Sequence, residues 1–149
     1  MKNKSKRKKI KQQKKRVQPS VNWPKEWLYL NEKEITPEDF LKVFPEGGPL
    51  ELQVWKEAGV IEVELPCGKS IDMEWGEPDL GEETGNAFLE GKNTKALYYV
   101  TVVPESFEEA RTAMKTITEM LGGGFFGDNK DFQPQIYKKK NSPSLSMET

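Results

Sequence analysis

The stretch Ala96-Leu-Tyr-Tyr-Val-Thr-Val-Val103 predicts the centre of the fold. Its aromatic and β-branched residues favour a strand, and its apolar side chains fall at odd and even positions alike, as in a strand covered on both faces. Ser106 followed by Glu109 is typical of a capping box, in which each side chain bonds a free backbone amide at the start of a helix. We therefore expect a central strand over 96–103 and a helix that begins at Phe107.

This helix should extend to Leu121, because apolar residues recur at spacings of three and four and Gly122 follows at a position suited to a C-cap. The glycine-rich stretch 122–131 follows a helix instead of opening one, so it does not match a phosphate-binding loop. It is expected to be a mobile turn. Residues 132–137 predict a short edge strand, because Pro134 has no N–H to donate to a neighbouring strand.

Residues 50–75 predict a three-stranded antiparallel meander, since apolar and polar residues alternate with period two between turns at 57–59 and 66–69. One face should then be apolar: Leu50, Leu52, Val54, Ile61, Val63, Leu65, Ile71, Met73 and Trp75. The opposite face should hold Gln53 and six candidate partner-binding residues: Glu51, Trp55, Glu62, Glu64, Asp72 and Glu74. A solvated face is one interpretation of this acidic set, and a docking surface is the other.

Three further segments complete the expected domain. Residues 21–30 hold several aromatic residues, and Trp23 and Trp27 share a face if Pro24 opens a helical turn, so the segment is interpreted as a lid on the core. Thr36-Pro37 predicts a short helix over 37–44 with Phe40, Leu41 and Phe44 buried. The acidic stretch 76–93 is interpreted as a long loop with a helical turn near 87–90, either a binding loop or a plain insertion.

Together these segments predict an α+β fold with a mostly antiparallel sheet of four to five strands, a main helix over 107–121 packed on it and the short helix over 37–44. The expected organisation is a disordered basic arm over 1–20, a single acidic domain over 21–138 and a disordered tail over 139–149. The 149-residue chain has the length of one such domain with tails.

Composition excludes several classes of chemistry. The chain has no histidine, which removes histidine-activated nucleophiles and the usual zinc sites. Cys67 is the only cysteine and is expected to be an ordinary turn residue. Carboxylate catalysis by Glu62, Glu64, Asp72 and Glu74 is the one enzymatic alternative left. No catalytic residue, metal or cofactor is predicted.

The charge of the chain is divided unevenly. Residues 1–16 hold 10 of the 23 basic residues and no acid, which leaves 13 basic against 24 acidic residues and a charge of −11 on the remainder. The arm should be disordered in isolation, because its charges repel one another and it has little to bury. No apolar stretch follows it that would serve as a signal peptide or membrane span, so a cytoplasmic protein is expected, or a nuclear one in a eukaryote.

These features predict a small intracellular, non-enzymatic binding protein of the inhibitor, immunity or adaptor type. Its acidic sheet face and the 76–93 loop would bind a basic protein partner. The alternative is a nucleic-acid-associated protein that binds phosphates without sequence preference through the arm. The arm residues concerned are Lys6, Arg7, Lys8, Lys9, Lys14, Lys15 and Arg16.

Overall fold

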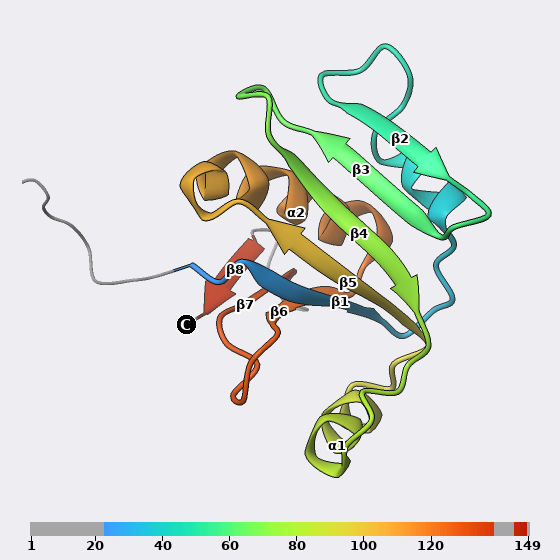
Figure 1. Cartoon of the computed structure of the whole chain (residues 1–149), viewed down its shortest axis with the longest axis vertical. Helices are drawn as coiled ribbons and strands as arrows, with labels where there is room; N and C mark the ends of the chain where they lie inside the picture. The colour runs from blue at the N-terminus through green and yellow to red at the C-terminus, as the bar shows by residue number, and fades with distance from the viewer. Residues whose placement is uncertain (1–22, 139–144, 149) are drawn as a thin grey trace, which may run out of the picture.

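The computed structural model describes residues 23–138 and 145–148 and contains one sheet of eight strands in the order β2-β3-β4-β5-β1-β6-β7-β8. Every neighbouring pair is antiparallel (Figure 1). The strands are β1 (Glu26–Asn31), β2 (Glu51–Trp55), β3 (Val60–Glu64), β4 (Ser70–Gly76), β5 (Ala96–Val102), β6 (Gly124–Gly127), β7 (Gln135–Lys138) and β8 (Leu145–Glu148). The predicted α+β class is confirmed, but the prediction of four to five strands was too low.

Two α-helices and two short 3-10 helices accompany the sheet in the described part of the chain. They are α1 (Glu83–Gly91), α2 (Phe107–Leu121), η3 (Pro37–Lys42) and η4 (Pro104–Ser106). Helix α2 has the predicted bounds, and the short helix predicted at 37–44 is the 3-10 helix η3. No helix in the described part of the chain is long and apolar enough to cross a membrane.

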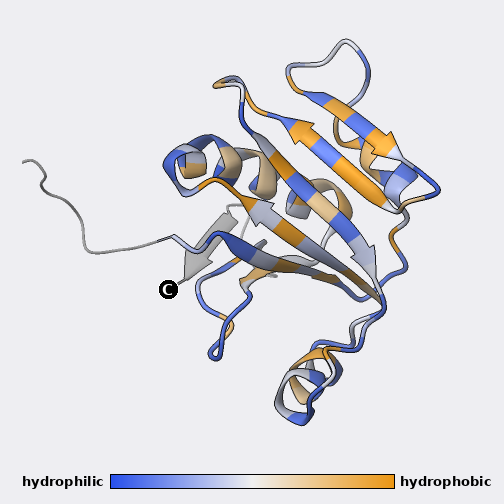
Figure 2. Cartoon of the chain, viewed as in Figure 1, coloured by the Kyte–Doolittle hydropathy of each residue, from blue (hydrophilic) through white to orange (hydrophobic). Residues whose placement is uncertain are grey.

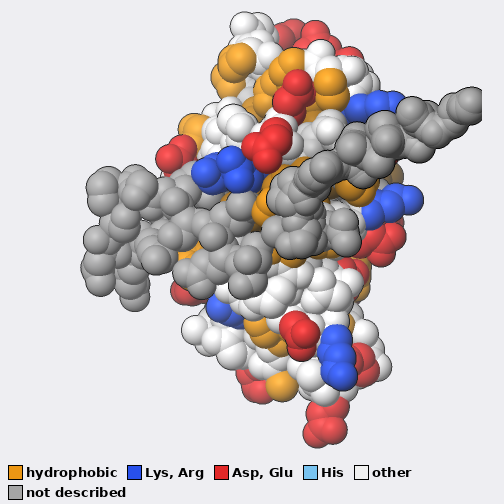
Figure 3. All heavy atoms as spheres, turned by 90° about the vertical axis from the view of Figure 1, so that its left-hand side faces the viewer, with side chains coloured by type: hydrophobic (Ala, Val, Ile, Leu, Met, Phe, Trp, Pro, Cys, Tyr) orange, Lys and Arg blue, Asp and Glu red, His pale blue; other side chains and the backbone are white. Residues whose placement is uncertain are grey.

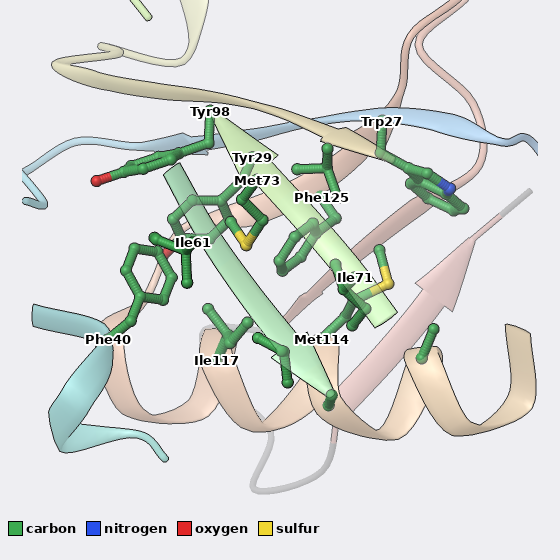
Figure 4. Packing of buried hydrophobic residues seen from close by; sticks show 14 of the residues in the cluster. Trp27, Tyr29, Phe40, Ile61, Ile71, Met73, Tyr98, Met114, Ile117 and Phe125 are labelled. Carbon is green, nitrogen blue, oxygen red and sulfur yellow. The ribbon is translucent and has the colours of Figure 1, made fainter. Parts of the chain in front are cut away.

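Strand β5 lies between β4 and β1, as expected of a central strand. Helix α2 covers one face of the sheet, which we call the inner face. All five residues of the predicted helical stripe are buried: Phe107, Ala110, Met114, Ile117 and Leu121. In Figure 4 Met114 and Ile117 point from α2 toward Ile61, Ile71 and Met73 of the sheet. Burial of one such aliphatic side chain contributes about 1.5–3 kcal/mol, so this layer is the main core.

The predicted register of the meander is confirmed. Val63 lies opposite both Leu52 and Ile71, and Glu62 lies opposite both Gln53 and Asp72. The alternation of apolar and polar residues is visible along β2, β3 and β4 in Figure 2. Because the side-chain period of a strand is two, this register places the whole acidic set on the face opposite α2, which we call the outer face.

The segment 21–30 is not a lid with a helical turn, because Glu26–Asn31 forms β1 in the middle of the sheet. Trp27 is fully buried and stacks on Phe107 at a centroid distance of 5.6 Å. The local spacing of the tryptophans resembles a helical turn, but pairing with a strand about 70 residues away decides the conformation. Buried strands with apolar side chains on both faces lack the alternation that would have revealed this one.

The glycine-rich stretch after α2 is not a mobile turn, because Gly124–Gly127 forms the buried strand β6. Gly123 has φ of 75°, and a Cβ added there would lie 2.3 Å from the carbonyl oxygen of Leu30. A Cβ on Gly127 would lie 2.1 Å from the carbonyl oxygen of Gln133. Glycine is therefore needed at these two positions because neighbouring backbone approaches closely. A glycine-rich composition is equally typical of a flexible turn, so the sequence alone does not separate the two roles.

The segment 76–93 is not a long loop with one turn, because half of it is helix α1. Leu89 of α1 is buried with Leu28, Leu30, Leu97 and Phe126, which form a second apolar cluster. This cluster lies on the outer face, where β5, β1 and β6 would otherwise expose apolar side chains. Helix α1 is thus part of the core packing and lies at one end of the sheet (Figure 1).

The C-terminal strands also differ from the prediction. The strand predicted at 132–137 is β7, which begins at Gln135, after Pro134, and pairs with β6 and β8 instead of forming an edge. Strand β8 falls within the stretch 139–149 predicted as a tail, and its sequence Leu-Ser-Met-Glu alternates apolar and polar residues. The predicted arm over 1–20 and the rest of the tail lie outside the described residues.

Two local details of the helices need correction. Ser106 makes no capping bond to α2, and Glu109 instead accepts a bond at 3.0 Å from the backbone N–H of Cys67 in the β3–β4 turn. A carboxylate of this kind does cap η3, where Asp39 accepts from the backbone N–H of Thr36 at 2.8 Å. Leu41, predicted to be buried on η3, is 47% exposed, because a 3-10 helix turns more tightly than the α-helix assumed.

Candidate binding surface on the outer face of the sheet

The outer face is divided between two environments. Helix α1 covers it at one end of the sheet, over Leu28, Leu30, Leu97 and Phe126 of β1, β5 and β6, whereas no described helix covers it over β2, β3 and β4. This uncovered part, which we call the acidic face, contains all six residues predicted from the sequence: Glu51, Trp55, Glu62, Glu64, Asp72 and Glu74. Glu62 is half-buried and the other five are exposed. The register therefore assembles the predicted set on one surface.

Strand pairing arranges this surface in rows that cross the sheet. One row runs from Trp55 through Val60 and Glu74 to Tyr99. The next row runs from Gln53 through Glu62, Asp72 and Thr101 to Glu26 on β1. Adjacent strands lie about 4.8 Å apart, so each row extends over roughly 15–20 Å. Aromatic side chains thus stand at both ends of the first row, and carboxylates occupy much of the second.

The carboxylates of the acidic face form no ion pair with a basic side chain of the described residues. Ion pairs among the described residues join Lys42 to Asp39, Lys56 to Glu38 and Arg111 to Glu108, and none of them involves the acidic face. Asp72 accepts a bond at 3.0 Å from the hydroxyl of Ser70, which leaves its charge in place. Like charges opposite one another on neighbouring strands destabilise a sheet by a few tenths of a kcal/mol or more. A cationic partner would relieve this repulsion.

Sequence reasoning missed three residues that extend this surface. Glu26 and Tyr99 lie on strands that were not expected to show an outer face, and Tyr99 is 38% exposed there. Asp128 follows β6, and its backbone N–H donates to the carbonyl oxygen of Glu26 at 3.0 Å. Asp128 is exposed, but desolvation by its surroundings, with the nearby charge of Glu26, raises the pKa of its carboxyl. The alternation of inward and outward side chains, extended from β4 to the neighbouring β5, would have identified Tyr99 as an outer-face residue. No pattern in the sequence around Asp128 indicates its position.

A cleft of about 490 Å³ opens beside Tyr99, between the N-terminal end of α1 and the turn that links β6 to β7. It is lined by Leu80, Glu82, Thr84, Gly85, Tyr99, Asp128, Asn129, Lys130 and Phe132. The side chain of Asn129 holds the turn closed, since its Nδ2 donates to the carbonyl oxygen of Gln133 at 2.6 Å and its Oδ1 accepts from the backbone N–H of Asp131 at 3.1 Å. We call this cavity the Tyr99 cleft.

The other candidate sites on the described surface are a metal site, the thiol of Cys67 and a second charged patch. Among the described residues no group of three or more histidine, cysteine or acidic side chains is placed to hold a metal ion. Cys67 is exposed in the β3–β4 turn, as expected. On the side of the molecule shown in Figure 3, acidic and basic side chains are interspersed, and neither sign gathers into one patch of the described surface.

The seven basic residues proposed to contact nucleic acid lie in the arm, outside the described residues: Lys6, Arg7, Lys8, Lys9, Lys14, Lys15 and Arg16. Their role stays a prediction from sequence. The chain matches no protein-family model, no curated protein and no solved structure.

Proposed function

We propose that this chain is a non-enzymatic binding protein, of the inhibitor, immunity or adaptor type, whose acidic face engages a basic protein partner. The observation that carries the proposal is the set of five carboxylates that have no basic partner among the described residues and that share one face with exposed Trp55. Complementary charge increases the rate and specificity of association.

The aromatic residues of the acidic face support protein recognition over simple solvation. Trp55 is 46% exposed and Tyr99 is 38% exposed, at opposite ends of one row. Tryptophan and tyrosine are enriched among the residues that contribute most to binding energy at interfaces. A solvated acidic face does not need large aromatic side chains in its rows. The segment 76–93 contributes at the rim, where Glu82 and Glu83 at the start of α1 are exposed.

Reversal of charge at Glu62, Glu64 and Glu74 tests the proposal. The triple lysine variant should capture less basic protein from a nuclease-treated lysate, because attraction to the face becomes repulsion. Its thermal midpoint should stay close to that of the parent, since substitutions on a solvent-facing surface usually change stability by no more than about 0.5 kcal/mol each and all three side chains, including half-buried Glu62, lie on the outer face. Capture is measured by mass spectrometry of the proteins retained on the immobilised chain.

A matched control separates the face from net charge. Glu46, Glu105 and Glu119 are exposed, make no ion pair among the described residues and lie away from the acidic face. Lysine at these three positions gives the same net charge, and this variant should retain capture. An equal loss of capture in both variants would show that binding depends on the net charge of the chain and not on the acidic face, which would also reject the proposal. Unchanged capture in the first variant would reject the proposal.

The competing function is nucleic-acid binding through the arm, which holds ten basic residues and no acid. In that case nuclease treatment should remove the captured material, and deletion of residues 1–16 should abolish binding while the triple reversal should not. Affinity for duplex DNA should fall with salt with a log–log slope of about −0.9 for each phosphate contacted. Titration of the full chain and the arm-deleted chain at two salt concentrations distinguishes the two functions.

A further inference from the structure

We propose that the Tyr99 cleft is a pocket for an arginine side chain of the basic partner, so that the partner is anchored there and spread across the acidic face. This inference rests on the proposed function and deepens it. The cleft adjoins the acidic face, because Tyr99 ends the row that begins at Trp55 and also lines the cleft. Its volume of about 490 Å³ leaves room for a guanidinium group and the methylenes that carry it.

The walls of the cleft include two aromatic rings held by close packing. A Cβ on Gly76 would lie 2.7 Å from Cε2 of Tyr99, so the absence of a side chain at Gly76 lets the tyrosine ring lie against β4. Phe132 stacks on Phe88 of α1 with ring centroids 4.0 Å apart and planes 1° apart. Phe88 in turn meets Phe126 edge-on at 5.2 Å. A guanidinium group stacks favourably on aromatic faces.

Acidic groups lie at the same place. Asp128 lines the cleft and its backbone bonds to Glu26, so two carboxyl-bearing residues meet at this end of the sheet. Asp128 is exposed, and desolvation together with the charge of Glu26 raises the pKa of its carboxyl. Glu82 is fixed as the N-cap of α1 because its Oε1 accepts from the backbone N–H of Gly85. A cation in the cleft would offset these charges.

Lys130 also lines the cleft, but it does not neutralise the cleft. Lys130 makes no ion pair within the described part of the chain, and the two acidic residues that line the cleft, Glu82 and Asp128, together exceed its charge. The combination of excess negative charge with flat aromatic walls favours arginine over lysine, because the lysine ammonium has no planar surface to stack. It also disfavours an anion or a purely apolar group.

The test uses acetyl-hexaarginine amide as a probe of the full chain, with affinity measured by calorimetry at near-physiological salt. Tyr99→Ala and Asp128→Asn should each weaken binding at least about fivefold, whereas Tyr99→Phe should bind like the parent because the ring is kept. Glu77→Gln is the matched control for Asp128→Asn, since Glu77 lines a separate cleft beside Trp75. Acetyl-hexalysine amide should bind more weakly and lose less affinity with Tyr99→Ala.

The outcomes separate this inference from the function on which it rests. If Tyr99→Ala and Asp128→Asn bind hexaarginine like the parent while the triple reversal at Glu62, Glu64 and Glu74 weakens binding, the pocket is rejected and the acidic face is retained. If none of these variants weakens binding, both are rejected. An equal loss in Glu77→Gln would also overturn the pocket, because binding would then follow net charge. Thermal melting of each variant confirms that the folded chain is compared.

Discussion

Gly123 precedes the first residue of β6, where the chain leaves α2 and enters the sheet beside β1. Its φ of 75° lies in the region that side chains rarely adopt, and the carbonyl oxygen of Leu30 occupies the space where a Cβ would lie. The hydroxyl of Tyr29 reaches the same turn and donates to the carbonyl oxygen of Gly122 at 2.7 Å. A single residue without a side chain thus allows α2, the turn and β1 to meet.

Gly123→Ala should therefore destabilise the fold by more than its backbone conformation alone accounts for. Gly81→Ala is a matched control, because Gly81 has φ of 79° but no atom within 4 Å of the added Cβ. The left-handed conformation costs alanine about 1–2 kcal/mol at both positions. The clash at Gly123 adds to that cost, so chemical denaturation should show a larger loss there by at least about 1 kcal/mol. Equal losses would mean that the turn can shift away from Leu30.

At the scale of elements, the parts that the sequence predicts well have a local pattern. The meander and its register follow from period-two alternation, and α2 follows from spacings of three and four. Strands β1 and β6 lack such a pattern, because one is buried on both faces and the other begins and ends in glycine. Long-range pairing decides both of them. The acidic set was therefore predictable, whereas Asp128 follows β6, which was not predicted, and the Tyr99 cleft also needs helix α1 and the turn after β6.

Helix α1 shows how a segment that looks like an acidic loop in the sequence contributes to stability. Leu89→Ala should destabilise the protein by about 2–5 kcal/mol, because Leu89 is 3% exposed and its removal leaves a cavity over the sheet. Leu41→Ala on η3 is the matched control, since the same atoms are removed from a side chain that is 47% exposed, and it should cost no more than about 0.5 kcal/mol. Urea denaturation measures both. A small effect at Leu89 would make α1 a loosely attached segment after all.

The whole molecule separates charge by position. The helix-covered inner face holds the main core, the outer face presents carboxylates without basic partners among the described residues, and the basic residues of 1–16 stand apart in the chain. The net charge of −1 thus describes neither part. A binding protein for a basic partner and an arm for phosphates are both compatible with this division, and the two charged parts can be removed one at a time.

Deletion of residues 1–16 should leave the thermal midpoint nearly unchanged at physiological salt, because the arm offers almost no apolar side chain to bury: Met1 and Ile10 are the only ones it contains. The two described cores are built from residues that follow the arm, beginning with Trp23, which stacks on Phe107. Scanning calorimetry of the full and shortened chains at low and high salt measures the effect. A loss of several degrees, equivalent to about 1 kcal/mol for a domain of this size, would instead show that the arm binds the body. Because exposed ion pairs are screened by salt, a loss that vanishes at high salt would show that this contact is made by charged groups, and its absence in the triple variant at Glu62, Glu64 and Glu74 would place it on the acidic face, where it would compete with the proposed partner.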